Sequence, residues 1–303
     1  MRKIFLFSIL IFLFSCSSSS SEEIRKSAVS GAFYPADKDE LTKEIDVFLA
    51  NVEKITPVED IIAIVVPHAG FSYSGQVAAY SFKELQGRKL NSVVIISNSH
   101  RARFPGIAID DTQAWETPLG LVKVDKKMAD KLVTDSEAIR YNSDIHRGEH
   151  AIEVQLPFLQ TVAEGGFKIV PILFGNSGDD SYKELAQRLA SNLGKDDIVV
   201  ISTDMSHYPS YEDANIVDKK TLEVIKQSDV SKLTEHIRVI EAEGIPEEQT
   251  LLCGIDGVKT LIELNNILGG GSIEVLKYLN SGDTDIGDKS RVVGYSSILI
   301  YTP

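Results

Sequence analysis

Cysteine is scarce in this chain of 303 residues, which contains only Cys16 and Cys253. If Cys16 is lipidated after removal of an N-terminal leader, as expected below, an intrachain disulfide is excluded and Cys253 is a free thiol. Such a thiol is often a small buried hydrophobic residue, but it can also be a metal ligand or a nucleophile.

An excess of positive charge is also lacking. The chain has 31 Lys and Arg residues against 44 Asp and Glu residues, for a formal charge of −13. Binding to nucleic acid without sequence preference needs a cationic surface, so we exclude that class of partner.

The chain beyond residue 21 has no internal repeat, no low-complexity segment and no linker rich in Gly and Pro. The glycines at 269–271 neither follow a strand nor open a helix, as the loop of a dinucleotide or phosphate site must. We therefore expect a single domain over residues 24–303.

The N-terminus has the features of an export signal. Arg2 and Lys3 precede an apolar run over residues 4–14, which is too short to span a bilayer comfortably. Ser15 and Cys16 then resemble the end of the lipobox of bacterial lipoproteins.

This resemblance implies cleavage before Cys16 and lipidation of that residue. We expect a lipoprotein signal peptide over residues 1–15 and a flexible Ser-rich tether over residues 16–23. The protein would then be extracytoplasmic and held at a bacterial membrane by its lipid anchor. A plain secretory signal and an uncleaved anchor are the alternatives.

Apolar runs alternate with amphipathic stretches along the rest of the chain. Continuous apolar runs, typical of interior strands in a parallel sheet, occur at residues 61–66, 92–96 and 198–201. Further strands are expected at residues 120–124, 167–174 and 292–301. Helices are expected at residues 39–52, 75–85, 126–134, 150–163, 181–193, 214–227, 231–242 and 253–267. This alternation predicts an α/β fold, a single domain with a central, mainly parallel sheet flanked by helices.

Each of the three interior strands leads to a histidine. His68, His100 and His207 follow these strands within a few residues. Ligands in open α/β sheets bind just beyond the carboxyl ends of the strands. A neutral imidazole at such a position can bind a metal or act as an acid or base.

Two acidic residues are spaced to pair with imidazoles. His150 and Glu153 would share one helical face, because residues three apart are neighbours on a helix. Asp204 and His207 lie at one strand end, where an acid can orient the ring. Either pair could instead be a structural ion pair. Arg101, directly after His100, indicates a negatively charged ligand.

Cys253 lies at the start of the last expected helix. The N-terminus of a helix favours the thiolate, which is the metal-binding form of cysteine. Two imidazoles and one thiolate suit copper, iron or zinc, and ligand type alone does not choose among them.

Seven segments, in order along almost the whole chain after residue 27, resemble the Memo family, whose bacterial members include the AmmeMemoRadiSam system protein B. They are residues 31–35, 67–75, 97–100, 117–120, 149–158, 202–208 and 252–254.

The resemblance implies a fold similar to the class III extradiol dioxygenases. It implies metal ligands at His68, His100 and Cys253, with cysteine where the dioxygenases have a carboxylate. It also implies an acid–base or supporting pair at Asp204 and His207.

The function predicted from these observations is a redox-capable metal site, holding iron or copper with zinc behind, in a metal-dependent oxidoreductase of unknown substrate. Asp204 and His207 would be catalytic. Arg101, His150 and Glu153 would contact the substrate, a small molecule or peptide. The alternatives are a binding module for a small anion or peptide without turnover, and a copper-handling protein.

Overall fold

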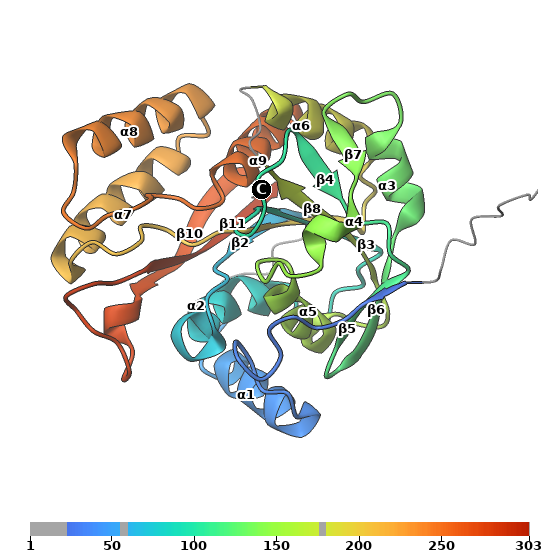
Figure 1. The fold of residues 1–303 in the computed structure, drawn as a ribbon, viewed down its shortest axis with the longest axis horizontal. Coiled ribbons are helices and arrows are strands. Elements are labelled where there is room, and N and C mark those ends of the chain that lie inside the picture. The colour runs from blue at the N-terminus through green and yellow to red at the C-terminus, as the bar shows by residue number, and fades with distance from the viewer. Residues whose placement is uncertain (1–22, 55–59, 176–179, 303) are drawn as a thin grey trace, which may run out of the picture.

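The computed structural model describes residues 23–54, 60–175 and 180–302. These residues form one mixed sheet with the strand order β1-β5-β6-β8-β3-β9-β2-β11-β10, and β4 and β7 are added beside β8 (Figure 1). The predicted signal peptide, Cys16 and nearly all of the predicted tether lie outside the described residues. Within the described part, no helix combines the length and apolarity needed to cross a membrane.

The strands and helices have the following bounds. The strands are β1 (Ile24–Arg25), β2 (Asp60–Val66), β3 (Ser92–Asn98), β4 (Ile107–Ile109), β5 (Ala114–Thr117), β6 (Gly120–Val124), β7 (Ile139–Tyr141), β8 (Lys168–Phe174), β9 (Ile198–Ser202), β10 (Ser272–Asn280) and β11 (Gly294–Thr302). The α-helices are α1 (Lys38–Ala50), α2 (Phe71–Glu84), α3 (Lys126–Val133), α4 (Ser143–His146), α5 (Leu156–Val162), α6 (Ser181–Asn192), α7 (Tyr211–Ile225), α8 (Val230–Glu243) and α9 (Ile255–Ile267). Two 3₁₀ helices cover Glu153–Gln155 and Ser281–Asp283.

The middle of the sheet is parallel. Strands β8, β3, β9 and β2 are neighbours that all run in one direction. Antiparallel pairs occur toward the edges, in β2–β11–β10 on one side and in β5–β6 and β4–β8 on the other. The predicted fold class is therefore confirmed: one α/β unit with a mainly parallel centre.

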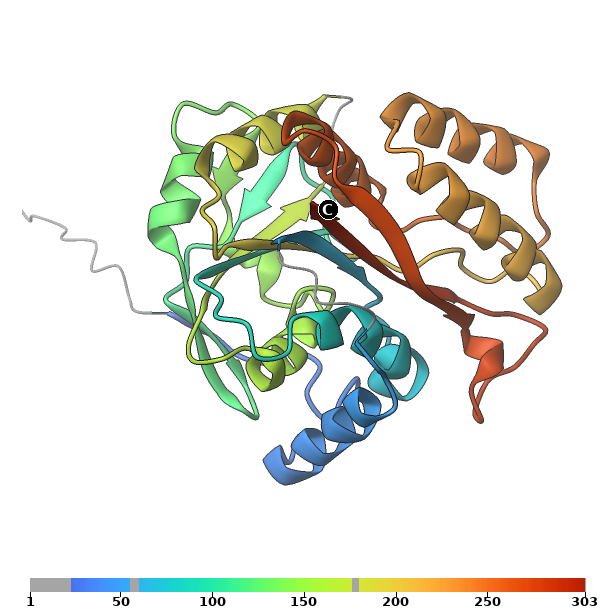
Figure 2. The same cartoon turned by 180° about the vertical axis from the view of Figure 1, so that it is seen from behind.

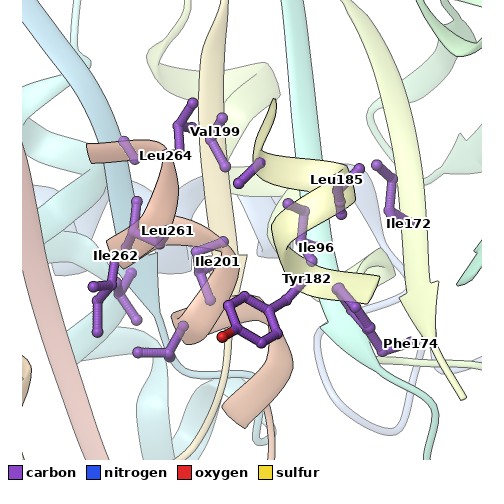
Figure 3. Close-up of a cluster of buried hydrophobic side chains, with 14 of the residues drawn as sticks. Ile96, Ile172, Phe174, Tyr182, Leu185, Val199, Ile201, Leu261, Ile262 and Leu264 are labelled. Atoms are coloured by element: carbon purple, nitrogen blue, oxygen red, sulfur yellow. The ribbon is translucent and has the colours of Figure 1, made fainter. Parts of the chain in front are cut away.

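Helices cover both faces of this sheet, which is why its central strands are apolar throughout. Residues of α6 and α9 pack against one face, and residues of α1, α2 and α5 pack against the other (Figures 1 and 2). Figure 3 shows the first of these cores, where Leu185 of α6 and Leu261 of α9 lie over Ile96 and Ile201 of the sheet. The two cores fix the central strands and so fix the positions of their carboxyl ends.

One predicted helix differs in a way that matters for the site. We expected residues 150–163 to be one helix, but α5 begins only at Leu156 and has Pro157 in its first turn. Proline suits the first turn of a helix because it has no N–H to donate. His150 lies in an irregular segment just before a turn at residues 151–152, which leads into the 3₁₀ helix that begins at Glu153. The predicted shared helical face of His150 and Glu153 does not form.

Candidate metal centre

The candidate residues follow the carboxyl ends of three neighbouring strands, at one edge of the sheet. His68 follows β2, His100 follows β3, and Asp204 and His207 follow β9, which lies between the other two strands. Cys253 reaches the same place from the segment before α9. The structure thus brings together residues that are far apart in sequence, as the strand-end argument predicts.

His68, His100 and Cys253 form a compact group of possible metal ligands. One ligand atom from each lies within 4.8 Å of the others. His68 Nε2 is 3.2 Å from Cys253 Sγ, and the rings of His68 and His100 have centroids 4.8 Å apart. His68 is buried, while the side chains of His100 and Cys253 are partly accessible. The group therefore has a protected side and an open side.

The tautomer of His68 is set by Ser202, a residue that the sequence analysis did not single out. The Ser202 hydroxyl donates to the carbonyl oxygen of Ala151 at 2.6 Å, so its oxygen is left to accept from His68 Nδ1 at 2.9 Å. Gln155 Nε2 also donates to this oxygen, at 2.9 Å. His68 Nδ1 therefore carries the proton, and Nε2 presents its lone pair toward Cys253.

Glu149 is the main functional residue that the sequence analysis missed. It is fully buried, and its carboxylate accepts the backbone N–H of His100 at 2.7 Å and of His150 at 2.9 Å. His100 Nδ1 and His150 Nδ1 each lie 3.1 Å from its Oε1. A carboxylate that receives Nδ1–H fixes the ring and leaves Nε2 free. The only signal in the sequence was an acid directly before His150.

The charges in this group are strongly interdependent. Burial raises the pKa of Glu149, but hydrogen bonds from His100 and His150 hold that pKa well below its usual range. Burial lowers the pKa of His100, yet its contacts with Cys253 and Glu149 raise it to about 10. Burial and the charges of His100 and His150 lower the pKa of His68 well below its usual value. Without a metal ion, the cluster thus combines a neutral His68 imidazole with a Glu149 carboxylate–His100 imidazolium pair, and a metal ion at His100 Nε2 would take the place of the proton there.

Asp204 contacts the group differently from our prediction. Its Oδ1 accepts the backbone N–H of His68 at 2.8 Å, and its own N–H points to Cys253 Sγ at 3.1 Å. Burial raises the pKa of Asp204. His207 Nδ1 instead donates to the carbonyl oxygen of Met205 at 3.0 Å. The backbone carbonyl of Met205, and not the Asp204 carboxylate, therefore accepts the hydrogen bond that orients the His207 ring.

The three predicted substrate contacts have different positions. His150 is near the ligand group, with its ring centroid 4.8 Å from that of His100. Arg101 is exposed and packs beside Gly148, next to Glu149. Glu153 is buried and binds Arg25, the backbone N–H groups of residues 28 and 29, and a tyrosine hydroxyl. Its carboxylate is used by these partners and lies outside the histidine cluster.

Two helices point their N-termini toward the group. α2 begins after Gly70, near His68, and α9 begins after Gly254, next to Cys253. The N-cap residue of each helix is a glycine, which has no side chain to cap the helix. The positive end of a helix dipole favours negative charge, so both N-termini favour a thiolate or an anionic ligand here.

The donor set fits a transition metal. Nitrogen and sulfur ligands bind an ion such as zinc at about 2.0 to 2.3 Å, which puts them about 3 to 4 Å from each other. The 3.2 Å separation of His68 Nε2 and Cys253 Sγ is in this range. The two imidazoles and the thiol would supply three ligands to such an ion, which would leave a further coordination position for solvent or substrate.

The fold and this group define a class of protein, an α/β protein with imidazole and thiol ligands beyond the ends of parallel strands. The chain belongs to the Memo family, whose model for Memo-like protein matches residues 25–299. This confirms the resemblance seen in the sequence.

Relatives in several archaea match almost the full length of the chain. A MEMO1 family protein of Methanobrevibacter smithii is 38% identical over 287 residues, which cover 90% of this chain and 98% of that protein. One of Thermoplasma acidophilum is 34% identical over 279 residues, covering 92% and 99%. One of Nitrosopumilus maritimus is 32% identical over 280 residues, covering 91% and 98%.

Proposed function

We propose that this protein binds a redox-active transition metal ion through His68, His100 and Cys253 and works as a metal-dependent oxidoreductase. Iron and copper are equally favoured as the native metal. Both imidazole and thiolate suit them, and zinc stands behind because it supplies no redox chemistry. The substrate class is a small molecule or a peptide.

The observation that carries this proposal is the fixed arrangement of the two imidazoles around the thiol. Ser202 holds His68 by Nδ1, and Glu149 holds His100 by Nδ1. Each ring therefore offers Nε2, and His68 Nε2 meets Cys253 Sγ. Supporting contacts of this kind are typical of metal sites, where the second ring nitrogen of a ligand is bound by a carboxylate or another oxygen.

The residues around the ligands have distinct tasks in this proposal. When bound, the metal would supply electron transfer and a position for oxygen or substrate. His207 would accept or deliver a proton at Nε2, because its Nδ1 is bound to Met205. Asp204 would hold the backbone of His68 and the thiol of Cys253 in place. Arg101 and His150, at the open side, would contact an anionic part of the substrate.

A binding module is the second candidate, and a specific observation favours it. Two uncapped helix N-termini and the exposed Arg101 surround the group, which is suited to holding a small anion or an acidic peptide without turnover. A copper-handling protein is a third candidate that uses the same three ligands. His207 separates the first two, because a passive binder needs no proton carrier.

The cellular location in this proposal rests on the sequence. The charged and apolar segments before Cys16 and the Ser-rich segment after it support a lipoprotein anchored outside the cytoplasm. Mass spectrometry of the protein isolated from bacterial membranes should find a chain that begins at a lipidated Cys16. An unmodified Cys16 or an intact leader would contradict this part of the proposal.

Metal titration tests the main proposal. The metal-free protein should bind one Fe(II) or Cu(I) ion per chain under reducing conditions. Alanine substitutions at His68, His100 or Cys253 should each weaken binding by at least about tenfold, since each removes a ligand. His236→Ala is a matched control, because this ring is bonded to Thr221 on the α7–α8 pair. Wild-type affinity in all three ligand variants would overturn the metal site.

Turnover distinguishes an oxidoreductase from a binding module. His207→Gln should keep the metal and lose most of any oxidation activity found with candidate substrates. Equal activity in His207→Gln and wild type would favour a binding or copper-handling protein.

A further inference from the structure

Arg25 is buried at the end of β1, far from the histidines in sequence but close to the segment that carries Glu149. It is 3% exposed. Its Nε donates to the carbonyl oxygen of His146 at 3.1 Å, and its Nη2 donates to the carbonyl oxygen of Glu149 at 2.6 Å. Its Nη1 binds Glu153, and its Cζ lies 4.2 Å from the centre of the Trp115 ring.

The two carbonyl groups mark the ends of a single turn. The Glu149 N–H also donates to the His146 carbonyl oxygen, at 3.3 Å, which closes residues 146–149 into this turn. One guanidinium therefore holds both ends of the turn at once. Only a planar fork of donors can do this, because the ammonium of a lysine is a single point at the end of a flexible chain.

The position of this turn determines where the Glu149 carboxylate lies. That carboxylate contacts Nδ1 of both His100 and His150 at 3.1 Å, and it accepts the backbone N–H of each. We propose that Arg25 is a positioning residue for the metal centre: by holding the turn at residues 146–149, it places Glu149 to fix the rings of His100 and His150.

The third nitrogen of the guanidinium, Nη1, makes a separate contact with Glu153. Glu153 binds Arg25 and also accepts the N–H groups of Ala28 and Val29 and the hydroxyl of Tyr34. These contacts of Glu153 join the N-terminal segment to the body of the protein. A substitution at Glu153 therefore removes the ion pair and leaves the two carbonyl contacts of Arg25 in place. It is the matched control for a substitution at Arg25.

The effect of Arg25 on the two imidazole rings can be measured in metal-free protein. The proposal rests on the proposed function, but this measurement does not depend on metal binding. In ¹⁵N-labelled, metal-free protein, the Nδ1 protons of His100 and His150 should give downfield imidazole resonances, because both lie against a buried carboxylate. Arg25→Lys should lose or shift these resonances by more than the line width. Glu153→Gln should destabilise the protein but keep the resonances at temperatures where it is folded.

A second measurement connects the geometry to the metal. Co(II) is a spectroscopic probe whose visible absorption reports its ligands. Arg25→Lys should bind Co(II) about tenfold more weakly than wild type, as expected when a supporting partner of a metal ligand is disturbed. Glu153→Gln, measured while folded, should stay within about threefold. If Co(II) fails to bind wild type while the imidazole resonances respond as expected, the proposed function fails and the role of Arg25 stands.

The role of Arg25 can still be tested if the Arg25→Lys variant does not fold. If Arg25→Lys does not fold, the double variant Arg25→Gln with Glu153→Gln removes both buried charges together, which avoids leaving one unpaired. It should fold and lack the downfield resonances of wild type. Resonances in either Arg25 variant that match wild type, or an equal loss of resonances in Glu153→Gln, would overturn the proposal.

Discussion

Glu149 and Asp218 are both fully buried carboxyl groups, yet their surroundings shift their pKa values in opposite directions. Glu149 lies between two imidazoles, and their hydrogen bonds keep its pKa well below the usual range despite its burial. Asp218 on α7 accepts the N–H of Ser206 at 3.0 Å and the hydroxyl of Tyr278 at 2.7 Å. Burial raises the pKa of Asp218 to about 7, and the neighbouring Glu248 adds to this.

The comparison shows that burial alone does not determine the charge of an acid. A neutral donor stabilises a carboxylate, but a cationic partner stabilises it far more. The candidate metal centre has imidazoles that can be cationic, so its acid stays ionised and fixes the rings. The Asp218 region has a phenol and an amide, so its acid is protonated below neutral pH. The first region holds the rings of His100 and His150, and the second joins α7 to β10 and to the chain after β9.

The largest loss of stability is expected from a substitution at Gly294, which packs against the Asp218 carboxyl group. A Cβ on Gly294 would lie 1.9 Å from Asp218 Oδ2. Because the Asp218 side chain is buried, it cannot move away from this Cβ without disturbing its neighbours. Gly294→Ala should lower the free energy of unfolding by about 3 kcal/mol or more. Gly166→Ala, where a Cβ would meet nothing within 4 Å, is the control. Equal denaturant midpoints for the two variants would contradict this packing.

Removal of the Asp218 charge should stabilise the protein at alkaline pH. The folded-state pKa, about 7, lies above the unfolded value of about 3.9, so the wild type loses stability as pH rises from about 4 to about 7. This loss is about 4 kcal/mol for three pKa units; Asp218→Asn lacks it and should be more stable than wild type at pH 8 by at least about half of that amount. The difference should shrink toward pH 4. Urea unfolding of both proteins at the two pH values measures it, and a pH-independent difference would contradict the raised pKa.

The corresponding neutral substitution at Glu149 should be harmful. Glu149→Gln keeps one acceptor oxygen but loses the charge that holds the two rings. Metal affinity should fall about tenfold, which is about 1.4 kcal/mol. Competition with a chromophoric chelator measures this. Wild-type affinity in Glu149→Gln would mean that backbone contacts alone position the ligands.

The central strands could be predicted from the sequence because they are long, apolar and covered on both faces. The end of a strand then predicted the location of His68 and His100, since parallel strands all end at one edge. β10 was not predicted. It is an edge strand with an irregularity between Val275 and Lys277, and most of its residues are half-buried, so it lacks a clear alternation. The strands β4 and β7 have only three residues each, too few for a periodic pattern.

The supporting residues of the site were harder to predict than the ligands. Glu149 meets His100 across 49 positions of sequence, through a turn that Arg25 holds from the first described strand. Ser202 is the buried last residue of β9, and its sequence position does not distinguish it from other buried residues. Only its hydrogen bond with His68 Nδ1 shows that it orients that ring. The predicted pairing of His150 with Glu153 assumed a helix, but the chain turns there before α5 begins at Leu156. Long-range contacts decide these three cases, and local spacing does not record them.

X-ray absorption at the metal edge tests the central claim most directly. The protein loaded with one Cu(I) or Fe(II) ion should show one sulfur ligand at about 2.3 Å and two imidazole nitrogens at about 2.0 Å. The sulfur should disappear in Cys253→Ala, and one imidazole should disappear in His68→Ala. A shell of oxygen and nitrogen alone in the wild-type protein, or a sulfur ligand that persists in Cys253→Ala, would contradict the proposed centre.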